Sequence, residues 1–291
     1  ATDAASAGSD LINLGTRVDL APDALTVHGG KRWITNACSA DWLLVLGRHR
    51  PQPHFTSLVW ALVPAAAPGV RATPAGDTMF AGAAVGHLSF DRVTLGRDHL
   101  AGTPGLGLAV FGRHVTTERL AGALWAGART RRVLAATLDR LITRHLGDQP
   151  MWANPAIRER FSRCLMHWWR LDELTARFAG QLDEPTSLVS SMLLKATVAE
   201  AVDAILGECA RLHGADAFVA QGLAHLRAES AMFGIAGGAA DAMLAGVADS
   251  AGSLLAARGR PATGPTRPPD PPAAQPPAAQ PATAARPGGW L

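Results

Sequence analysis

The hydrophobic period of the chain changes near Gly105, and this change constrains the fold more than any other feature of the sequence. Before it, short apolar runs bounded by Pro and Gly, such as residues 58–63 (LVWALV), are typical of buried strands. After it, apolar residues recur every three or four positions, which is the pattern of amphipathic helices. Because strands and helices are segregated along the chain, the sequence predicts an α+β fold, with a strand-rich domain over residues 1–103 and a helical domain over residues 104–257.

The helical part divides at Pro- and Gly-containing breaks. We expect helices over residues 105–146, 157–182, 187–213 and 239–257. Four helices with short links predict an antiparallel four-helix bundle. Residues 258–291 are dominated by Pro and Ala (PPDPPAAQPPAAQPA) and are predicted to form a disordered tail, because such a composition cannot build a core.

Composition narrows the function classes. Hydrophobic residues make up 48% of the chain and charged residues 18%, which predicts a globular protein. The formal charge of +3 is small and Lys and Arg form no run, so nucleic-acid binding is not expected. No apolar run is long enough to span a bilayer, so no membrane partner is expected. Three scattered cysteines without C-x-x-C spacing predict buried thiols, a reducing cytoplasmic location and no metal site; they are Cys38, Cys164 and Cys209.

Residues 25–42 (LTVHGGKRWITNACSADW) predict a β-hairpin whose turn contains the pair Gly29-Gly30, since glycine supplies the positive φ of a tight turn. In the second strand, Trp33 and Thr35 would project from the same face. The apolar ring of Trp33 and the hydroxyl of Thr35 could together back a flat, polar-edged ring such as a flavin. The alternative is a core Trp beside a surface Thr.

Several motifs resemble, in order and spacing, those of the acyl-CoA dehydrogenase family. They are Ala7-Gly8-Ser9-Asp10, Leu14-Gly15-Thr16-Arg17, residues 30–36 (GKRWITN) with Ala40-Asp41-Trp42, residues 88–93 (LSFDRV), and Thr117-Glu118-Arg119-Leu120. The resemblance runs from about residue 2 to about residue 250. It implies a small middle β-barrel, a C-terminal helical bundle, bound FAD, an acyl thioester substrate and an electron-transferring flavoprotein as acceptor. It also implies an N-terminal helical domain, so we expect either a fragment or a partner chain that supplies that domain.

The implied reaction removes a proton from the α carbon of the thioester and passes a hydride from the β carbon to flavin N5. Many family members use a Glu in the loop before the last helix as the base, and Gly237 stands at that place here. Other members use a Glu in the first C-terminal helix, which matches Glu118; enclosure in an apolar pocket would make it a stronger base. Gly237 is then implied as a backbone N–H donor to the thioester carbonyl. The alternative for Glu118 is a solvated pair with Arg119.

The resemblance also implies contacts to the substrate and the flavin edge. Ser9 matches a residue that touches the CoA part of the substrate, and its alternative is a turn serine. Arg119, next to the implied base, is assigned to the substrate. Thr2 or Asp3 would match a Thr that bonds the flavin edge.

Cofactor contacts across a subunit boundary are implied by two further motifs. Arg144 matches an Arg that reaches the FAD pyrophosphate of a neighbouring subunit, and the Arg donor fork suits phosphate. Arg211 and Gly214 match a Q-x-x-G-G motif that also wraps the neighbour's FAD, with Arg in place of Gln. We therefore expect a homodimer or a hetero-oligomer, with residues 193–212 at the contact.

Three functions are consistent with these residues. The first is FAD-dependent α,β-dehydrogenation of an acyl thioester, carried on CoA or on a carrier protein. The second is a non-catalytic subunit that keeps the fold, which the Gly at position 237 and the altered Arg motifs would explain. The third is a flavin-dependent monooxygenase, which needs no carboxylate base; oxygen uptake without loss of the α and β hydrogens would distinguish it.

Overall fold

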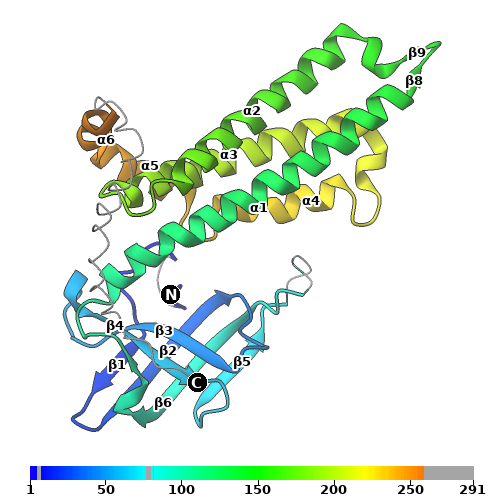
Figure 1. Ribbon diagram of the computed structural model, residues 1–291. Coiled ribbons are helices and arrows are strands. Elements are labelled where there is room, and N and C mark those ends of the chain that lie inside the picture. The colour runs from blue at the N-terminus through cyan, green and yellow to red at the C-terminus, as the bar shows by residue number, and fades with distance from the viewer. Residues whose placement is uncertain (5–7, 77–79, 81, 259–291) are drawn as a thin grey trace, which may run out of the picture.

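The computed structural model describes residues 1–4, 8–76, 80 and 82–258, and Figure 1 shows a curved sheet below a group of long helices. Within these described residues, seven strands form one sheet in the order β5-β6-β2-β1-β3-β4-β7. The strands are β1 (Arg17–Leu20), β2 (Ala24–Ile34), β3 (Trp42–Arg48), β4 (Leu58–Pro64), β5 (Val70–Pro74), β6 (Gly86–Gly96) and β7 (Leu100–Ala101). Adjacent strands are antiparallel except β1 and β3, which pair in parallel. The strand-rich region is confirmed, but the predicted closed barrel is not, because within the described residues β5 and β7 lie at the two ends of an open sheet.

The hairpin predicted around Gly29-Gly30 is wrong. Residues Ala24–Ile34 form the single strand β2, which pairs with β1 on one side and β6 on the other. The glycines serve close approach between strands instead of a turn. A Cβ on Gly29, where φ is 131°, would lie 2.7 Å from Thr16 Cα, and one on Gly30 would lie 3.0 Å from the Leu88 carbonyl oxygen.

The helical part contains three long helices: α1 (Gly107–Thr143), α2 (Pro155–Ala179) and α3 (Ser187–His213). The short β8 (His145–Leu146) and β9 (Gln149–Pro150) join α1 to α2 at the end far from the sheet (Figure 1). Three shorter helices follow: α4 (Leu223–Ser230), α5 (Ala240–Asp249) and α6 (Ala251–Arg258). The four-helix bundle is therefore not confirmed, because the fourth stretch is broken at Ser250 and α4 was not predicted. The predicted tail lies outside the described residues beyond Arg258.

Helix α1 is anchored to the sheet at its first residue. The indole Nε1 of Trp60 in β4 donates to the Gly107 carbonyl at 2.9 Å. A Cβ on Gly107 would lie 2.7 Å from the Leu58 carbonyl carbon, so only glycine allows this approach. Buried Leu14, Leu46, Leu58 and Trp60 pack with Leu108 and Phe111 across the junction. Helix α1 therefore connects the apolar core of the sheet to that of the helices.

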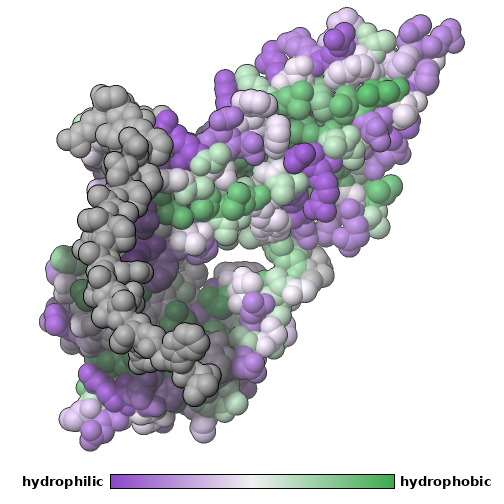
Figure 2. Space-filling model, viewed as in Figure 1, coloured by the Kyte–Doolittle hydropathy of each residue, from purple (hydrophilic) through white to green (hydrophobic). Residues whose placement is uncertain are grey.

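Helix α3 lies at the centre of the helical part, in contact with α1, α2, α4 and α5. Its apolar residues are enclosed, among them Leu194, Val198, Val202, Ile205 and Leu212. They therefore do not form the exposed apolar face that the predicted contact at residues 193–212 requires. Large apolar side chains are exposed on α2 instead, at Leu165, Met166 and Trp169, a set named here the α2 patch. Figure 2 shows apolar residues gathered over the helices on the face in view.

The three cysteines are free, as expected from their spacing. Cys164 and Cys209 are buried between α2 and α3, which confirms that part of the prediction. Cys38 is exposed, because the chain leaves β2 at Ile34 and turns at the surface before β3 begins. Within the described residues, no helix combines the length and apolar character needed to cross a membrane, and no cluster of three His, Cys, Asp or Glu side chains could hold a metal ion.

Candidate functional site

Glu118 and Gly237, the two residues predicted at the reacting centre, lie side by side. Glu118 is on α1, and Gly237 is in the connection between α4 and α5, where its φ is 71°. A Cβ on Gly237 would lie 3.3 Å from Glu118 Oε1. The structure therefore brings together two positions that the sequence separates widely.

A cavity of about 290 Å³ opens beside this pair. Its lining is mostly small or apolar, with three charged side chains: Glu118, Arg119, Ala121, Gly122, Ala123, Trp125, Lys195, Val198, Met232, Phe233, Ala236 and Gly237. Glu118 is exposed, so the enclosed apolar environment predicted for it is not found in the described residues. The cavity can admit a small acyl group beside a carboxylate that is open to solvent.

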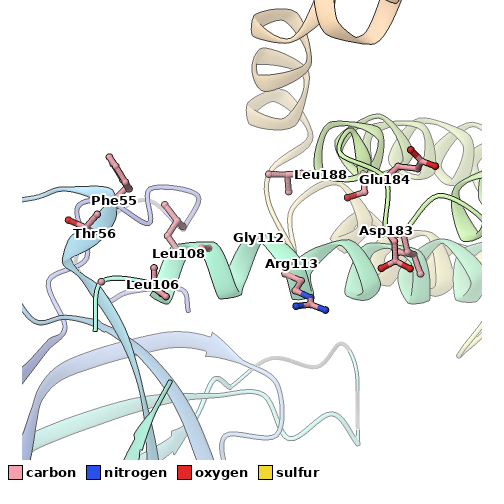
Figure 3. A pocket seen from close by; sticks show the side chains of 13 residues that line it. Phe55, Thr56, Leu106, Leu108, Gly112, Arg113, Asp183, Glu184 and Leu188 are labelled. Carbon is pink, nitrogen blue, oxygen red and sulfur yellow. The ribbon is translucent and has the colours of Figure 1, made fainter. Parts of the chain in front are cut away.

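A larger groove, of about 700 Å³, lies elsewhere on α1 (Figure 3). Phe55 and Leu106 border it near the sheet, and Leu188 covers it from the start of α3. Asp183 and Glu184 lie along its helical side. None of the site residues predicted from the sequence lines this groove, so size alone does not locate the chemistry.

Arg119 is buried, with 7% of its surface exposed. Its Nη1 donates to Ser191 Oγ at 2.8 Å, and its Nη2 donates to the Gly237 carbonyl at 3.4 Å and to Met243 Sδ at 3.0 Å. Burial lowers the pKa of Arg119, while the charge of Glu118 acts in the opposite direction. The guanidinium thus holds the connection that carries Gly237, in addition to lining the cavity where a substrate contact was predicted.

Lys195 is a member of the site that the sequence analysis missed. It lies on α3, is 8% exposed, and donates from Nζ to the Phe233 carbonyl. Burial, with a smaller contribution from the positive charge of Arg119, lowers its pKa to about 8, against the opposing effect of Glu118. A signal was available, because Lys195 is one of only two lysines in the chain and stands in the apolar run Leu193-Leu194-Lys195-Ala196.

Trp33 lies near the end of β2, with 57% of the residue's surface exposed. Its φ is 58°, a left-handed conformation that is uncommon for a bulky residue and often marks a functional position. A shift in the pairing of β2 with β6 between Lys31 and Ile34 accompanies this conformation. Thr35 follows the strand and is exposed, so the two residues do not share a strand face as predicted. The core-Trp alternative is also excluded by this exposure.

His87 supports Trp33 and was not foreseen from the sequence. The Trp33 N–H donates to His87 Nδ1 at 3.2 Å, and the two rings meet edge to face with centroids 5.0 Å apart. The Arg32 guanidinium lies 5.9 Å from the centre of the Trp33 ring. These contacts fix an exposed aromatic ring, which is the property that a platform for a flat cofactor needs.

The N-terminal residues contact both the sheet and the residue before α5. The Ser9 hydroxyl accepts from the Ala239 N–H at 3.3 Å. Ala239 precedes the first residue of α5 and is two residues after Gly237, so the residue predicted to contact CoA lies near the reacting centre. Asp3 is buried against Lys31 at 3.3 Å and accepts from the Thr16 N–H at 3.1 Å. Because the Asp3 carboxylate is bound to Lys31 and Thr16 inside the protein, Thr2 is the better of the two candidates for the flavin edge.

Arg144, Arg211 and Gly214 lie at the opposite end of α1 and α3 from the sheet. Arg144 follows the last residue of α1 and its Nη1 contacts Asp216 at 3.2 Å. Arg211 pairs with Glu208 through Nε at 2.9 Å and through Nη2. Gly214 ends α3 with a φ of 64°, and nothing lies within 4 Å of a Cβ placed there. Both guanidinium groups are more than half exposed and keep donors that face solvent.

The predicted cofactor residues therefore form two separate groups. Trp33 lies near the end of β2 in the sheet, whereas Arg144 follows the last residue of α1, at the end of that helix far from the sheet (Figure 1). Trp33 and its supports fit the flat ring of a flavin. The exposed donors of Arg144 and Arg211 fit a phosphate group, although carboxylates already occupy part of each. That the second group contacts a cofactor held by a neighbouring subunit stays a prediction from the sequence.

Comparison with known proteins matches residues 1–93 to the acyl-CoA dehydrogenase middle domain and residues 105–252 to the acyl-CoA dehydrogenase C-terminal domain. An acyl-[acyl-carrier-protein] dehydrogenase, MbtN of Mycobacterium sp. (strain MCS), is 29% identical over 227 residues, which cover 74% of this chain and 55% of that protein. The chain thus spans about half the length of this relative. A glutaryl-coenzyme A dehydrogenase in complex with glutaryl-CoA superposes with a TM-score of 0.80 at 19% identity, covering 87% of this chain and 65% of that one. The FAD complex of PigA gives a TM-score of 0.82 at 18% identity, covering 87% and 66%.

Proposed function

Because the chain belongs to the acyl-CoA dehydrogenase family, we propose that it takes part in the FAD-dependent α,β-dehydrogenation of an acyl thioester, carried on CoA or on a carrier protein. The observation that carries this proposal is the adjacency of Glu118 to Gly237, with a cavity beside them. Removal of the α proton needs a carboxylate to accept it and a donor, such as a backbone N–H, to stabilise the thioester oxygen, and both groups line this cavity. The boundaries we propose are a sheet domain over residues 1–103, a helical domain over residues 104–257 and a tail over residues 258–291.

The protein's own part in the reaction begins with Glu118. Its carboxylate takes the proton from the α carbon, and the electron pair left behind spreads onto the thioester oxygen. The Gly237 N–H is proposed to bind that oxygen, because donors placed in advance where negative charge develops stabilise the transition state. Bound FAD would supply the two-electron acceptor for the hydride that leaves the β carbon, so that a carbon–carbon double bond remains. Trp33, with His87 behind it and Thr2 or Thr35 at its edge, would hold the ring of that cofactor.

The assembly we propose places Arg144, Arg211 and Gly214 against the FAD of a neighbouring subunit. Their place at the end of α1 and α3 that is far from the sheet supports this arrangement (Figure 1). The neighbouring subunit would be a second copy of this chain or a different chain. An electron-transferring flavoprotein is the proposed acceptor, and Ser9 the proposed contact to the carrier part of the substrate.

A direct test is the visible spectrum of the purified chain together with its partner. We expect an oxidised flavin band near 450 nm (a wavelength set by the roughly constant chemistry of the cofactor) and its bleaching when an acyl-CoA or acyl-carrier substrate is added without oxygen. A flavin band that no acyl thioester bleaches would favour a non-catalytic subunit, a role that the absence of a carboxylate at Gly237 also fits. No flavin band in any complex would contradict the proposal.

A further inference from the structure

We propose that Arg119 and Lys195, named here the cationic floor, stabilise negative charge that develops in the cavity beside Glu118, and act as positioning residues for the connection that carries Gly237. The class of ligand rests on the proposed function. The positive potential of the cavity does not, because it follows from the burial and the partners of the two side chains.

The cationic floor is built from two neighbouring helices. Arg119 comes from α1 and Lys195 from α3, and each has less than a tenth of its surface exposed. Both line the same cavity as Glu118 and Gly237. Lys and Arg are rarely buried to this extent unless a carboxylate pairs with them, so two such residues under one cavity need a specific explanation.

Both side chains donate to one segment of backbone. Lys195 Nζ bonds the Phe233 carbonyl, and Arg119 Nη2 bonds the Gly237 carbonyl at 3.4 Å. The segment between these carbonyls ends at Gly237, and Gly238 follows it; their φ values are 71° and 110°, which glycine adopts easily. Two cations therefore fix the ends of a flexible connection whose Gly237 lies against Glu118.

The partners of the cationic floor are neutral. Carbonyl oxygens, the Ser191 hydroxyl and the Met243 sulfur satisfy the donors but carry no full charge, and Arg119 Nε is buried without a partner in the described residues. Among those residues, neither cation has a carboxylate within salt-bridge distance. Glu118 is the acid that raises the pKa of both, yet burial still lowers each pKa. The cavity is thus left with excess positive potential in a poorly solvated place.

Such a potential favours ligands that become negative over ligands that stay neutral. When Glu118 takes the α proton, its own negative charge is lost and an equal charge appears on the thioester oxygen. The two cations do not move during this transfer, so they stabilise the product of proton removal without any reorganisation. The neutral acyl group of an unreacted thioester gains little from them. The barrier falls to the extent that the two cations lie nearer to the thioester oxygen than to the Glu118 carboxylate, which they also stabilise before the transfer.

A reporter thiol tests the potential without flavin or thioester. Ala236 lines the cavity and is exposed, so Ala236→Cys in a Cys38→Ser background places a reactive thiol at its mouth. We would compare its alkylation by iodoacetate, an anion, with that by neutral iodoacetamide. Lys195→Met and Arg119→Gln should each lower the iodoacetate-to-iodoacetamide rate ratio by roughly threefold to tenfold. The matched control is Arg227→Met, which removes a cation that joins α4 to Asp203 of α3 outside the cavity, and should leave the ratio unchanged.

Binding calorimetry then tests the ligand class. The acyl part of acetoacetyl-CoA loses a proton readily and can bind as an enolate, whereas the acyl part of butyryl-CoA stays uncharged. Lys195→Met should weaken the binding of acetoacetyl-CoA by roughly tenfold and that of butyryl-CoA by less than about twofold, whereas a loosened fold would weaken the binding of both.

The two experiments separate the two proposals. If the alkylation rate ratio depends on Lys195 but the protein binds no thioester, the proposed function is overturned and the cationic floor is kept. An alkylation ratio unaffected by both substitutions would overturn the cationic floor, even if dehydrogenation is observed; should one variant fail to fold, the other decides.

Discussion

Glu118 Oε1 lies 3.3 Å from where a Cβ on Gly237 would stand, so the two positions share one space beside the cavity. A carboxylate on either residue would reach the same point. The absence of a side chain at Gly237 leaves Glu118 as the acid that can occupy it. The first two predictions follow from this relationship.

Replacing Glu118 by Gln should abolish most turnover. The amide keeps the size and hydrogen-bond reach of the side chain but cannot take a proton, and a general base is typically worth about 10²–10⁴-fold in rate. Stopped-flow reduction of bound flavin by the substrate would measure the loss, with flavin content and thioester affinity retained. Glu159→Gln on the surface of α2 is the matched control and should behave as the parent. Unchanged flavin reduction in Glu118→Gln would show that Glu118 is not the base.

A carboxylate at position 237 should replace the one lost at position 118. In the Glu118→Gln background, Gly237→Glu should restore a measurable part of the flavin reduction rate, because the new side chain begins where the old carboxylate ended. The positive φ of Gly237 should cost about 1 kcal/mol of unfolding free energy for any side chain. Gly237→Ala in the same background carries this backbone cost without a carboxylate and should restore nothing. Equal rates for the Glu and Ala variants would show that the two positions do not serve the same proton.

Lys195 should make the protein more stable as the pH rises from about 8 towards 10.5. Its pKa is lowered by burial, so across this range the unfolded chain binds more protons than the folded one, and the unfolding free energy increases with pH. Below pH 8 Lys195 is charged in both the folded and the unfolded state, so the unfolding free energy does not gain from its deprotonation. Relative to Lys195→Met, the parent should gain on the order of 2 kcal/mol between these limits in urea titrations. A difference between parent and variant that stays constant with pH would contradict this, and using the difference cancels the contributions of Lys31 and Cys38.

Trp33 should matter for flavin retention and little for stability. Its ring is largely exposed, so Trp33→Ala should change the unfolding free energy by less than about 1 kcal/mol. Trp60→Ala, which removes a buried ring at the junction of sheet and α1, should cost about 3–5 kcal/mol. The ratio of absorbance at about 450 nm to that of the protein should fall for Trp33→Ala, if the ring backs the flavin as proposed. Full flavin content in Trp33→Ala would remove Trp33 from the cofactor site.

The α2 patch should carry part of the subunit contact. Trp169→Glu places a charge among exposed apolar side chains and should shift the assembly towards monomer in sedimentation velocity at micromolar concentration. Leu255→Glu changes an exposed apolar residue on α6 in the same way, and should leave the assembly intact. An unchanged sedimentation coefficient in Trp169→Glu would place the contact elsewhere.

Local patterns located most of the elements, because each pattern depends on neighbours in sequence. The apolar run at residues 58–63 is β4, and the three- and four-residue spacings after Gly105 are α1, α2 and α3. The same local view failed at Gly29-Gly30, where a turn and a close strand contact both demand glycine. It failed again at residues 239–257, where helical composition does not reveal the break at Ser250.

The sequence by itself determined the family and the two residues worth testing, Glu118 and Gly237, because their motifs occupy fixed places along the chain. Only the tertiary structure decided that they meet, that Lys195 lies beneath them, and that His87 stands against Trp33. It also decided that Glu118 is exposed and that the apolar residues of α3 are buried among the other helices. The physical reason is that burial and contact between distant segments depend on how helices and strands pack, and a residue's neighbours in sequence carry no record of that packing.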